Sequence, residues 1–287
     1  MTKPTKILFI GLPSSGKTTF LAALWYLVDG INNTKLSLSR LTGDQDYLNN
    51  IRGKWLSCSP LERTKLTNEK ITNMLLFSKE TNKNIDLIIP DLSGETYNEQ
   101  WATRCWTKEF QNLVNSVNGG ILFIHPNEIV EPIRIDQTSI IVDEILDHEL
   151  SENEETANST TEWDQKNAPT QVKLVELLQF FKQSNKCIFP FKLTIIISAW
   201  DLITNKKNTP NKWLEKRLPL LHQFLLSNSD SYPYKIYGIS AQGGDYSSET
   251  SRLACINEPR DRITLIEQNK VGYDLTIPIY WLIENNE

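Results

Sequence analysis

Residues 11–18 read GLPSSGKT and follow the short apolar run KILFI at residues 6–10, and these two segments together indicate the fold. The apolar run has the composition of a buried strand, and residues 18–28 place their apolar side chains on one face of a helix. The eight residues fit the pattern G-x-x-x-x-G-K-[ST] at every position, between this strand and this helix. Such a turn aims backbone N–H groups inward at the positive end of the helix dipole, so the sequence predicts a phosphate-binding loop.

The residues of this loop have separate expected roles. Gly11 and Gly16 allow tight turning and close approach of phosphate oxygens. Lys17 is expected to bridge the β and γ phosphates of a nucleotide, and Thr18 to coordinate Mg²⁺. Four fixed positions match by chance in about one chain in a hundred of this length, so the pattern is specific. The residues expected to contact the phosphates are Pro13, Ser14, Ser15, Gly16, Lys17, Thr18 and Thr19.

Strands and helices alternate along the rest of the chain. Strands are predicted at residues 71–78, 84–89, 119–125, 191–197 and 236–239. Helices are predicted at residues 45–56, 97–117, 171–182, 211–226 and 275–283, with Pro219 breaking or kinking its run. Strands that are apolar on both faces and alternate with helices indicate a parallel sheet covered on both sides. We therefore expect an α/β protein with a three-layer α/β/α P-loop NTPase fold and a mainly parallel central sheet, in one domain over residues 1–287.

Composition excludes several other classes of protein. The chain has 287 residues and a net charge of −5, which argues against general binding of nucleic acid. No apolar run reaches the length of a membrane span, and the N-terminal apolar run is too short for a signal peptide, so a cytoplasmic location is expected. The cysteines lie far apart, and the histidines, His125 among them, share no metal-ligand spacing, so both residue types are expected to be structural or solvated.

The negative charge is concentrated in one segment. Residues 143–166 contain nine acidic residues and one lysine, a net charge of −8, which leaves +3 for the rest of the chain. The second half of the segment is polar and rich in Glu, Asn, Ser and Thr, which predicts a mobile or partner-facing surface insertion. We place this acidic insertion at about residues 126–170, between a strand and a helix.

Three more short motifs follow the phosphate-binding loop, each at the end of a predicted strand. They are DLSG at residues 91–94, SAWD at residues 198–201 and SAQ at residues 240–242. A carboxylate at the end of a strand beside the loop can hold Mg²⁺, and a following glycine lets its N–H group reach the γ-phosphate. Each motif alone is more often a plain strand terminus, but their order along the chain is informative.

The ordered set resembles the G1, G3, G4 and G5 motifs of the TRAFAC-class, Ras-like P-loop GTPases. The resemblance implies that Asp91 assists Mg²⁺ and that Gly94 contacts the γ-phosphate. It places Asp201, Ser240 and Ala241 around guanine. The carboxylate of Asp201 would accept from guanine N1–H and the 2-amino group, and the N–H group of Ala241 would donate to O6. GTP and GDP are the nucleotides that this resemblance implies.

A narrower resemblance is to the bacterial double-GTPase families, which are encoded in multi-component conflict or antiviral defence systems. It is carried by GKTTFLAAL, ERT around Arg63-Thr64, TQVKLV, SAWD and SAQGG. The resemblance implies a GTP-hydrolysing switch within a multi-protein complex, with another GTPase or an effector as its partner.

The chain departs from the Ras-like pattern at SAWD, the counterpart of the G4 motif. Ser198-Ala199 replaces Asn-Lys, so the lysine stem that covers the base is missing, and Trp200 or Gln242 is a candidate for stacking instead. Guanine preference then depends mainly on Asp201, where one bidentate contact is worth about 1–3 kcal/mol of base discrimination. GTP is favoured, and an ATP-using P-loop NTPase is the alternative.

Hydrolysis depends on residues near the γ-phosphate. We expect Lys17, Gly94 and Glu95 to be catalytic, with Glu95 at the position where many relatives have a glutamine that orients water. Glu95 as a solvated residue with slow hydrolysis remains equally open. The switch I threonine that completes the Mg²⁺ shell is Thr64 or Thr67, and we prefer Thr64. Residues 57–70 and 92–100 are expected to order around the γ-phosphate and to relax after hydrolysis.

Two other functions compete with the switch. The altered motifs and Glu95 also suit a nucleotide-binding scaffold with little or no hydrolysis. A small-molecule kinase shares the phosphate-binding loop but needs an arginine-rich lid, and the candidate lid at residues 143–166 is acidic.

Overall fold

The computed structural model describes residues 3–30, 33–41, 44–61, 71–90, 94–132, 167–184, 189–203 and 209–284, with the backbone alone at residues 41, 71 and 94–98. Among these residues, no helix is both long and apolar enough to cross a membrane.

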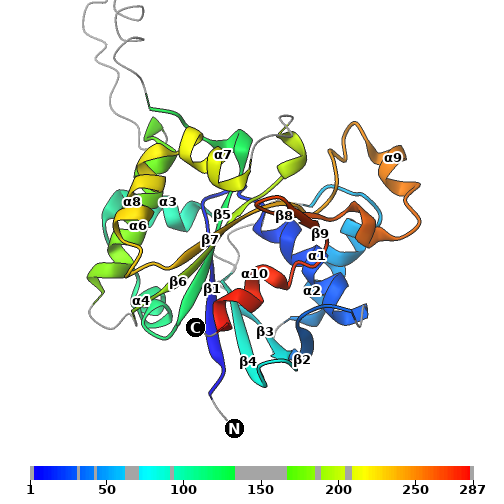
Figure 1. Ribbon diagram of the computed structural model, residues 1–287, viewed down its shortest axis with the longest axis horizontal. Helices are drawn as coiled ribbons and strands as arrows, with labels where there is room; N and C mark the ends of the chain where they lie inside the picture. The colour runs from blue at the N-terminus through cyan, green and yellow to red at the C-terminus, as the bar shows by residue number, and fades with distance from the viewer. Residues whose placement is uncertain are drawn as a thin grey trace, which may run out of the picture.

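A twisted sheet runs through the middle of the molecule, with strand order β2-β3-β4-β1-β5-β6-β7-β8-β9 (Figure 1). The five strands from β4 to β7 are parallel, and an antiparallel pair extends the sheet at each edge. The strands are β1 (Thr5–Ile10), β2 (Ser37–Leu41), β3 (Ile71–Ser78), β4 (Lys83–Pro90), β5 (Gly119–Ile124), β6 (Lys192–Ile197), β7 (Tyr234–Ser240), β8 (Thr264–Glu267) and β9 (Lys270–Gly272).

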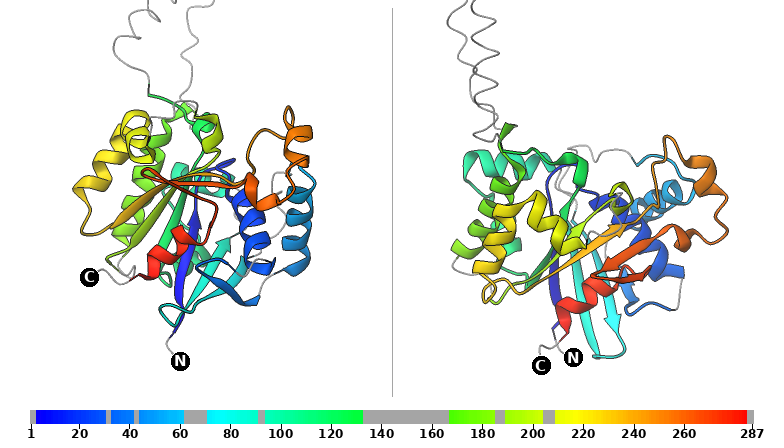
Figure 2. Two further views of the ribbon diagram at one scale, coloured as in Figure 1. Left: turned by 45° about the vertical axis from the view of Figure 1, so that its right-hand side comes forward. Right: turned by 45° about the horizontal axis from the view of Figure 1, so that its top comes forward.

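Helices cover both faces of the sheet, as Figures 1 and 2 show. One face carries α1, α2, α9, α10 and η5, and the other carries α3, α4, α6, α7 and α8. The helices are α1 (Lys17–Gly30), α2 (Gln45–Leu56), α3 (Gly94–Thr103), α4 (Lys108–Val114), η1 (Pro126–Glu128), α6 (Thr170–Gln183), η3 (Trp200–Leu202), α7 (Pro210–Arg217), α8 (Pro219–Ser227), α9 (Thr250–Ala254), η4 (Pro259–Arg262), α10 (Ile277–Tyr280) and η5 (Trp281–Ile283).

Strand β1 shows why these strands are apolar on both sides. Ile7 and Phe9 belong to the hydrophobic core under α1 and α2, whereas Leu8 and Ile10 belong to the core under α6 and α8. Successive side chains of a strand point to opposite faces, so a central strand must supply both cores. The predicted three-layer α/β/α fold is confirmed, and so is its parallel central sheet.

The structure differs from the sequence prediction in the helices after β4 and at the sheet edges. The helix predicted at residues 97–117 is two helices, because Arg104 adopts a left-handed backbone with φ of 56° after α3. The hydroxyl of Thr107 then accepts from the N–H of Phe110 and begins α4. Strands β2, β8 and β9 were not predicted, since short or polar edge strands lack a periodic apolar pattern. The break at Pro219 is confirmed, between α7 and α8.

Val130 and Thr170, near the two ends of the predicted insertion at about residues 126–170, lie side by side. The N–H of Val130 donates to the hydroxyl of Thr170 at 2.9 Å, and the N–H of Thr170 donates to the carbonyl of Val130 at 3.0 Å. The acidic residues 143–166 lie outside the described residues.

Candidate functional site

The carboxyl ends of the parallel strands carry the candidate site. The phosphate-binding loop follows β1, His125 follows β5, Ser198 follows β6 and Ala241 follows β7. Ligand sites of open parallel sheets lie at this edge, because the connections to the helices form a crevice there.

The phosphate-binding loop is held tightly against the strands beside it. Ser14 and Gly16 have left-handed backbones, with φ of 56° and 90°. A Cβ atom at Gly16 would lie 2.8 Å from Cβ and Oγ of Ser198, which no real side chain tolerates. Below the loop, the Phe20 ring lies 5.9 Å from that of Phe9 and 5.2 Å from that of Phe123, so α1 is fixed on β1 and β5.

Lys17 folds back over its own loop. Its Nζ donates to the carbonyls of Gly11 at 2.7 Å and Leu12 at 2.9 Å, and to the Oγ of Ser15 at 3.0 Å. Burial lowers the pKa of Lys17 to about 7, because the charged ammonium loses its hydration. An anionic ligand in the loop would restore the favourable environment of that charge, so the surroundings of the ammonium suit an anion.

Ser198 joins the end of β6 to the phosphate-binding loop. Its hydroxyl lies 2.9 Å from the carbonyl of Ser15 and 3.2 Å from that of Ile124, and its N–H donates to the same Ile124 carbonyl at 2.8 Å. Ser198 is buried, so these contacts are shielded from competing water. Ser198 therefore positions the loop against the end of β6.

A cavity of about 80 Å³ lies beside the phosphate-binding loop, where this loop meets the SAWD motif at residues 198–201 and the SAQ motif at residues 240–242. Gly16 and Thr19 border it on one side, and Ala199 and Gln242 on the other. Ile196, Ile239 and Phe20 add apolar surface. A partly apolar cavity next to a phosphate-binding loop has the character of a site for the base of a nucleotide.

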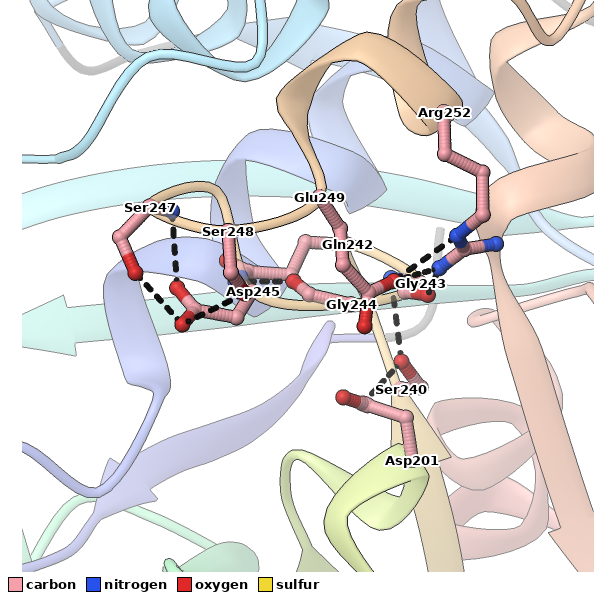
Figure 3. A network of polar contacts seen from close by, with 10 residues as sticks. All are labelled: Asp201, Ser240, Gln242, Gly243, Gly244, Asp245, Ser247, Ser248, Glu249 and Arg252. Carbon is pink, nitrogen blue, oxygen red and sulfur yellow. Dashed lines mark hydrogen bonds and ion pairs between the residues drawn. The ribbon is translucent and has the colours of Figure 1, made fainter.

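Asp201 lies at the start of the polar network that Figure 3 shows. The hydroxyl of Ser240 donates to Oδ1 of Asp201 and accepts from the N–H of Gly243 at 3.1 Å. Ser240 is buried at the end of β7, whereas Asp201 is exposed on η3. A serine fixed at a strand end therefore orients a carboxylate that solvent or a ligand can reach.

The loop after Ser240 is held by further contacts in the same network (Figure 3). The side-chain amide of Gln242 donates to the carbonyl of Gly244 at 2.7 Å, and the Arg252 guanidinium donates to the carbonyl of Gly243 at 3.0 Å and pairs with Glu249. Hydrogen bonds from Ser247 lower the pKa of Asp245, so that carboxylate is ionised and stabilises the turn.

Of the two candidates for stacking on a base, Trp200 is unsuitable. It is 7% exposed, and a Cβ atom at Gly238 of β7 would lie 2.3 Å from its ring, so the indole is part of the core. Gln242 lines the cavity, where its aliphatic stem is available.

His125 was not predicted as a site residue, yet it lines the cavity. Its Nδ1 accepts from the N–H of Asn127 at 3.2 Å, and burial lowers its pKa, so the ring is neutral at pH 7. Its place directly after the strand at residues 119–124 was the available signal, since this is the edge where the other motifs lie.

Several predicted site residues are not among the residues that the structure describes. Asp91, Thr64 and Thr67 are not among the described residues, and Arg63 is not either. Gly94 and Glu95 form the first turn of α3, with backbone alone described. Their roles stay predictions.

The described residues fit the chemistry of a Mg²⁺ site in part. Within the described ranges, no group of three His, Cys, Asp or Glu side chains is placed to bind a metal ion. Mg²⁺ beside a nucleotide keeps several waters and uses one or two protein oxygens plus phosphates. The hydroxyl of Thr18, in the first turn of α1, is such an oxygen.

The strand, the loop with its folded-back lysine and the adjoining cavity define a P-loop nucleotide-binding protein. The family model described as "DO-GTPase1: Double-GTPase 1" matches residues 8–282. The chain therefore belongs to the Double-GTPase 1 family, which confirms the resemblance to double GTPases. No curated protein sequence matches the chain.

Solved GTPase structures show a distant likeness. The bacterial selenocysteine-specific elongation factor EF-Sec is 15% identical with a TM-score of 0.37, covering 88% of this chain and 28% of its own. The Trypanosoma brucei small GTPase Arl6 with GppNp is 11% identical with a TM-score of 0.34, covering 89% and 100%. The S. cerevisiae Ski7 GTPase-like domain with GDP and inorganic phosphate is 12% identical with a TM-score of 0.41, covering 83% and 43%. The match thus spans less than a third of EF-Sec.

Proposed function

We propose that the protein is a GTP-binding molecular switch that hydrolyses GTP with Mg²⁺. The observation that carries this proposal is the cavity beside the phosphate-binding loop, bordered by Ala241 and close to the Asp201–Ser240 pair. Membership of the Double-GTPase 1 family supports it.

The phosphates would bind at the loop after β1. The backbone N–H groups of residues 13–19 and the ammonium of Lys17 supply the positive charge, and the N-terminus of α1 adds its dipole. Thr18 would hold Mg²⁺ together with Asp91 and Thr64, and the ion would neutralise charge on the β and γ phosphates.

The base would be recognised by polar groups at the rim of the cavity. The carboxylate of Asp201 accepts from N1–H and the 2-amino group of guanine, and the N–H of Ala241 donates to O6. Adenine presents an acceptor at N1 and a donor at C6, so both contacts would become repulsive. Ser240 holds the carboxylate in place for this contact.

Hydrolysis would take place at the start of α3. The N–H of Gly94 is suited to contact the γ-phosphate, and Glu95 to orient the attacking water. Residues 57–70 and 92–100 would order around the γ-phosphate and relax after its release, so the output is a change of protein partner. The resemblance to the bacterial double-GTPase families implies that this partner is another GTPase or an effector in a bacterial complex, with a role in defence.

Single-turnover hydrolysis tests this function against the two alternatives. Radiolabelled GTP with Mg²⁺ is expected to release phosphate above background, and ATP to release less. Tight GTP binding without phosphate release, even with partner proteins present, would identify a nucleotide-binding scaffold. Faster turnover of ATP than of GTP would identify an ATP-using P-loop NTPase.

Nucleotide binding is expected to take up a proton above pH 7. Lys17 has a pKa of about 7 without ligand, and adjacent phosphates raise it, so the lysine must gain a proton on binding at pH 8 but not at pH 6. Affinity should therefore fall as pH rises above 7, by at most about tenfold per pH unit. Calorimetry in buffers of different ionisation enthalpy measures the uptake. Equal uptake at pH 6 and pH 8 would show that Lys17 does not titrate on binding.

A further inference from the structure

Helix α2 reaches the loop that borders the cavity. The indole Nε1–H of Trp55, in the last turn of α2, donates to the carbonyl of Ala241 at 2.9 Å. Trp55 is fully buried, and Ala241 is 8% exposed. The hydrogen bond joins positions 186 residues apart in the sequence. Trp55 lies just before residues 57–70, which are expected to order around the γ-phosphate, and Ala241 lies in the loop after β7, which is expected to contact guanine.

Trp55 is itself fixed from the other side. Its carbonyl accepts from the hydroxyl of Tyr246 at 3.3 Å and from Nη1 of Arg262 at 3.2 Å. The guanidinium of Arg262 also lies 4.3 Å from the centre of the indole ring. The last carbonyls of a helix lack partners within the helix and favour positive charge, so these donors stabilise the end of α2.

The contact acts on the residue whose backbone N–H a base would meet. Ala241 has no polar side chain, so its contribution to base recognition is limited to its N–H group. A hydrogen bond to its carbonyl fixes the peptide that joins Ala241 to Gln242 and, with it, the Cα of Ala241. Because the N–H of Ala241 is bonded to that Cα, the contact limits how far this N–H can be displaced from the base. A buried tryptophan usually has a hydrogen-bond partner for its indole N–H. Here the partner is the carbonyl of Ala241 in the loop after β7, and not a group of α2 itself.

We propose that Trp55 is a specificity-positioning residue, which holds Ala241 so that its N–H selects purines with an oxygen at C6. This inference rests on the proposed guanine nucleotide function. It also makes α2 a direct structural connection between the loop after β7 and Ser57–Leu61, the first residues of the segment 57–70 that is expected to order around the γ-phosphate.

The test is the substitution Trp55→Phe, which keeps an aromatic ring in the core and removes the N–H donor. GTP, ITP and ATP are compared in competition binding. The preference for GTP over ATP, which depends on O6, is expected to fall by about five- to tenfold, the effect of one buried hydrogen bond. The ratio of GTP to ITP depends on the 2-amino group and Asp201, and it should not change.

The matched control is Trp25→Phe. The indole Nε1 of Trp25 donates to Oδ1 of Asn49 at 3.1 Å, so this variant loses a similar hydrogen bond in the same helix layer without touching the loop after β7. It should leave both ratios unchanged. If Trp55→Phe does not fold, Tyr246→Phe removes the donor to the Trp55 carbonyl and should lower the preference for GTP over ATP in the same direction.

Three results would overturn the inference. They are an unchanged GTP-to-ATP ratio in Trp55→Phe, an equal loss of affinity for all three nucleotides, and a parallel fall of the GTP-to-ITP ratio. Failure of the proposed function looks different, because the wild-type protein would then show no preference for GTP over ATP.

Discussion

Replacing Lys17 by methionine is expected to lower the affinity for GTP and GDP by at least about a hundredfold, equivalent to about 3 kcal/mol. The ammonium makes three contacts within the loop, and under the proposed function it would exchange them for contacts with phosphate. Methionine keeps the length and apolar volume of the stem, so the loss measures the charge. Fluorescent nucleotide titration gives the two dissociation constants.

The same substitution has a separate effect on stability. In the unfolded chain the lysine holds its proton up to a pKa of 10.5, whereas the folded protein releases it near 7. Between these values the unfolded state binds more protons, so the unfolding free energy of the wild type should rise with pH relative to Lys17→Met. Chemical denaturation without nucleotide at pH 7 and pH 10 measures this difference.

Lys182→Met is the control for both measurements. Lys182 is an exposed lysine of α6 that donates to Asn228, far from the loop in sequence, and its loss should change neither affinity nor the pH dependence. If Lys17→Met binds GTP as tightly as the wild type does, the loop after β1 is not the phosphate site.

Gly238→Ala is expected to destabilise the protein by about 1–3 kcal/mol or more. The added methyl group would lie 2.3 Å from the ring of Trp200, and that ring cannot move without shifting η3. Since η3 carries Asp201, the preference for guanine should fall along with stability. Thermal unfolding and competition binding of GTP and ATP measure the two effects.

Gly53→Ala makes the same chemical change where there is room. A Cβ atom at Gly53 meets nothing within 4 Å, and the residue is exposed in the interior of α2. This variant should be more stable by about 0.5–1 kcal/mol, because alanine favours the helix. The double variant Gly238→Ala, Trp200→Leu should recover part of the lost stability. If Gly238→Ala is as stable as the wild type, Trp200 is not packed against β7.

The phosphate-binding loop and the central strands were predictable from local sequence. Residues 11–18 form a contiguous motif, and a strand such as β5, GGILFI, has no polar side chain because both of its faces are buried. Helix α2 was predicted with its observed bounds, since Leu48, Ile51 and Trp55 follow helical spacing.

The rest depends on contacts between distant residues. Nothing near Trp55 in the sequence indicates a hydrogen bond to Ala241. For His125, its place after a strand indicated the edge of the sheet but not the cavity that its ring borders. Trp200 was a reasonable candidate for stacking by its position next to Asp201, but a glycine 38 positions further on opens a place for it in the core. The geometry around the short motifs is therefore determined by tertiary packing between distant residues.

Competition binding of GTP, ATP and XTP to the wild type and to Asp201→Asn tests the central claim most directly. Xanthine has an oxygen in place of the 2-amino group, so an asparagine amide can donate where the carboxylate accepted. The wild type should prefer GTP and the variant XTP, while Asp230→Asn, at an exposed turn, should behave as the wild type. An order of affinities that is the same in Asp201→Asn and the wild type would contradict guanine recognition by Asp201.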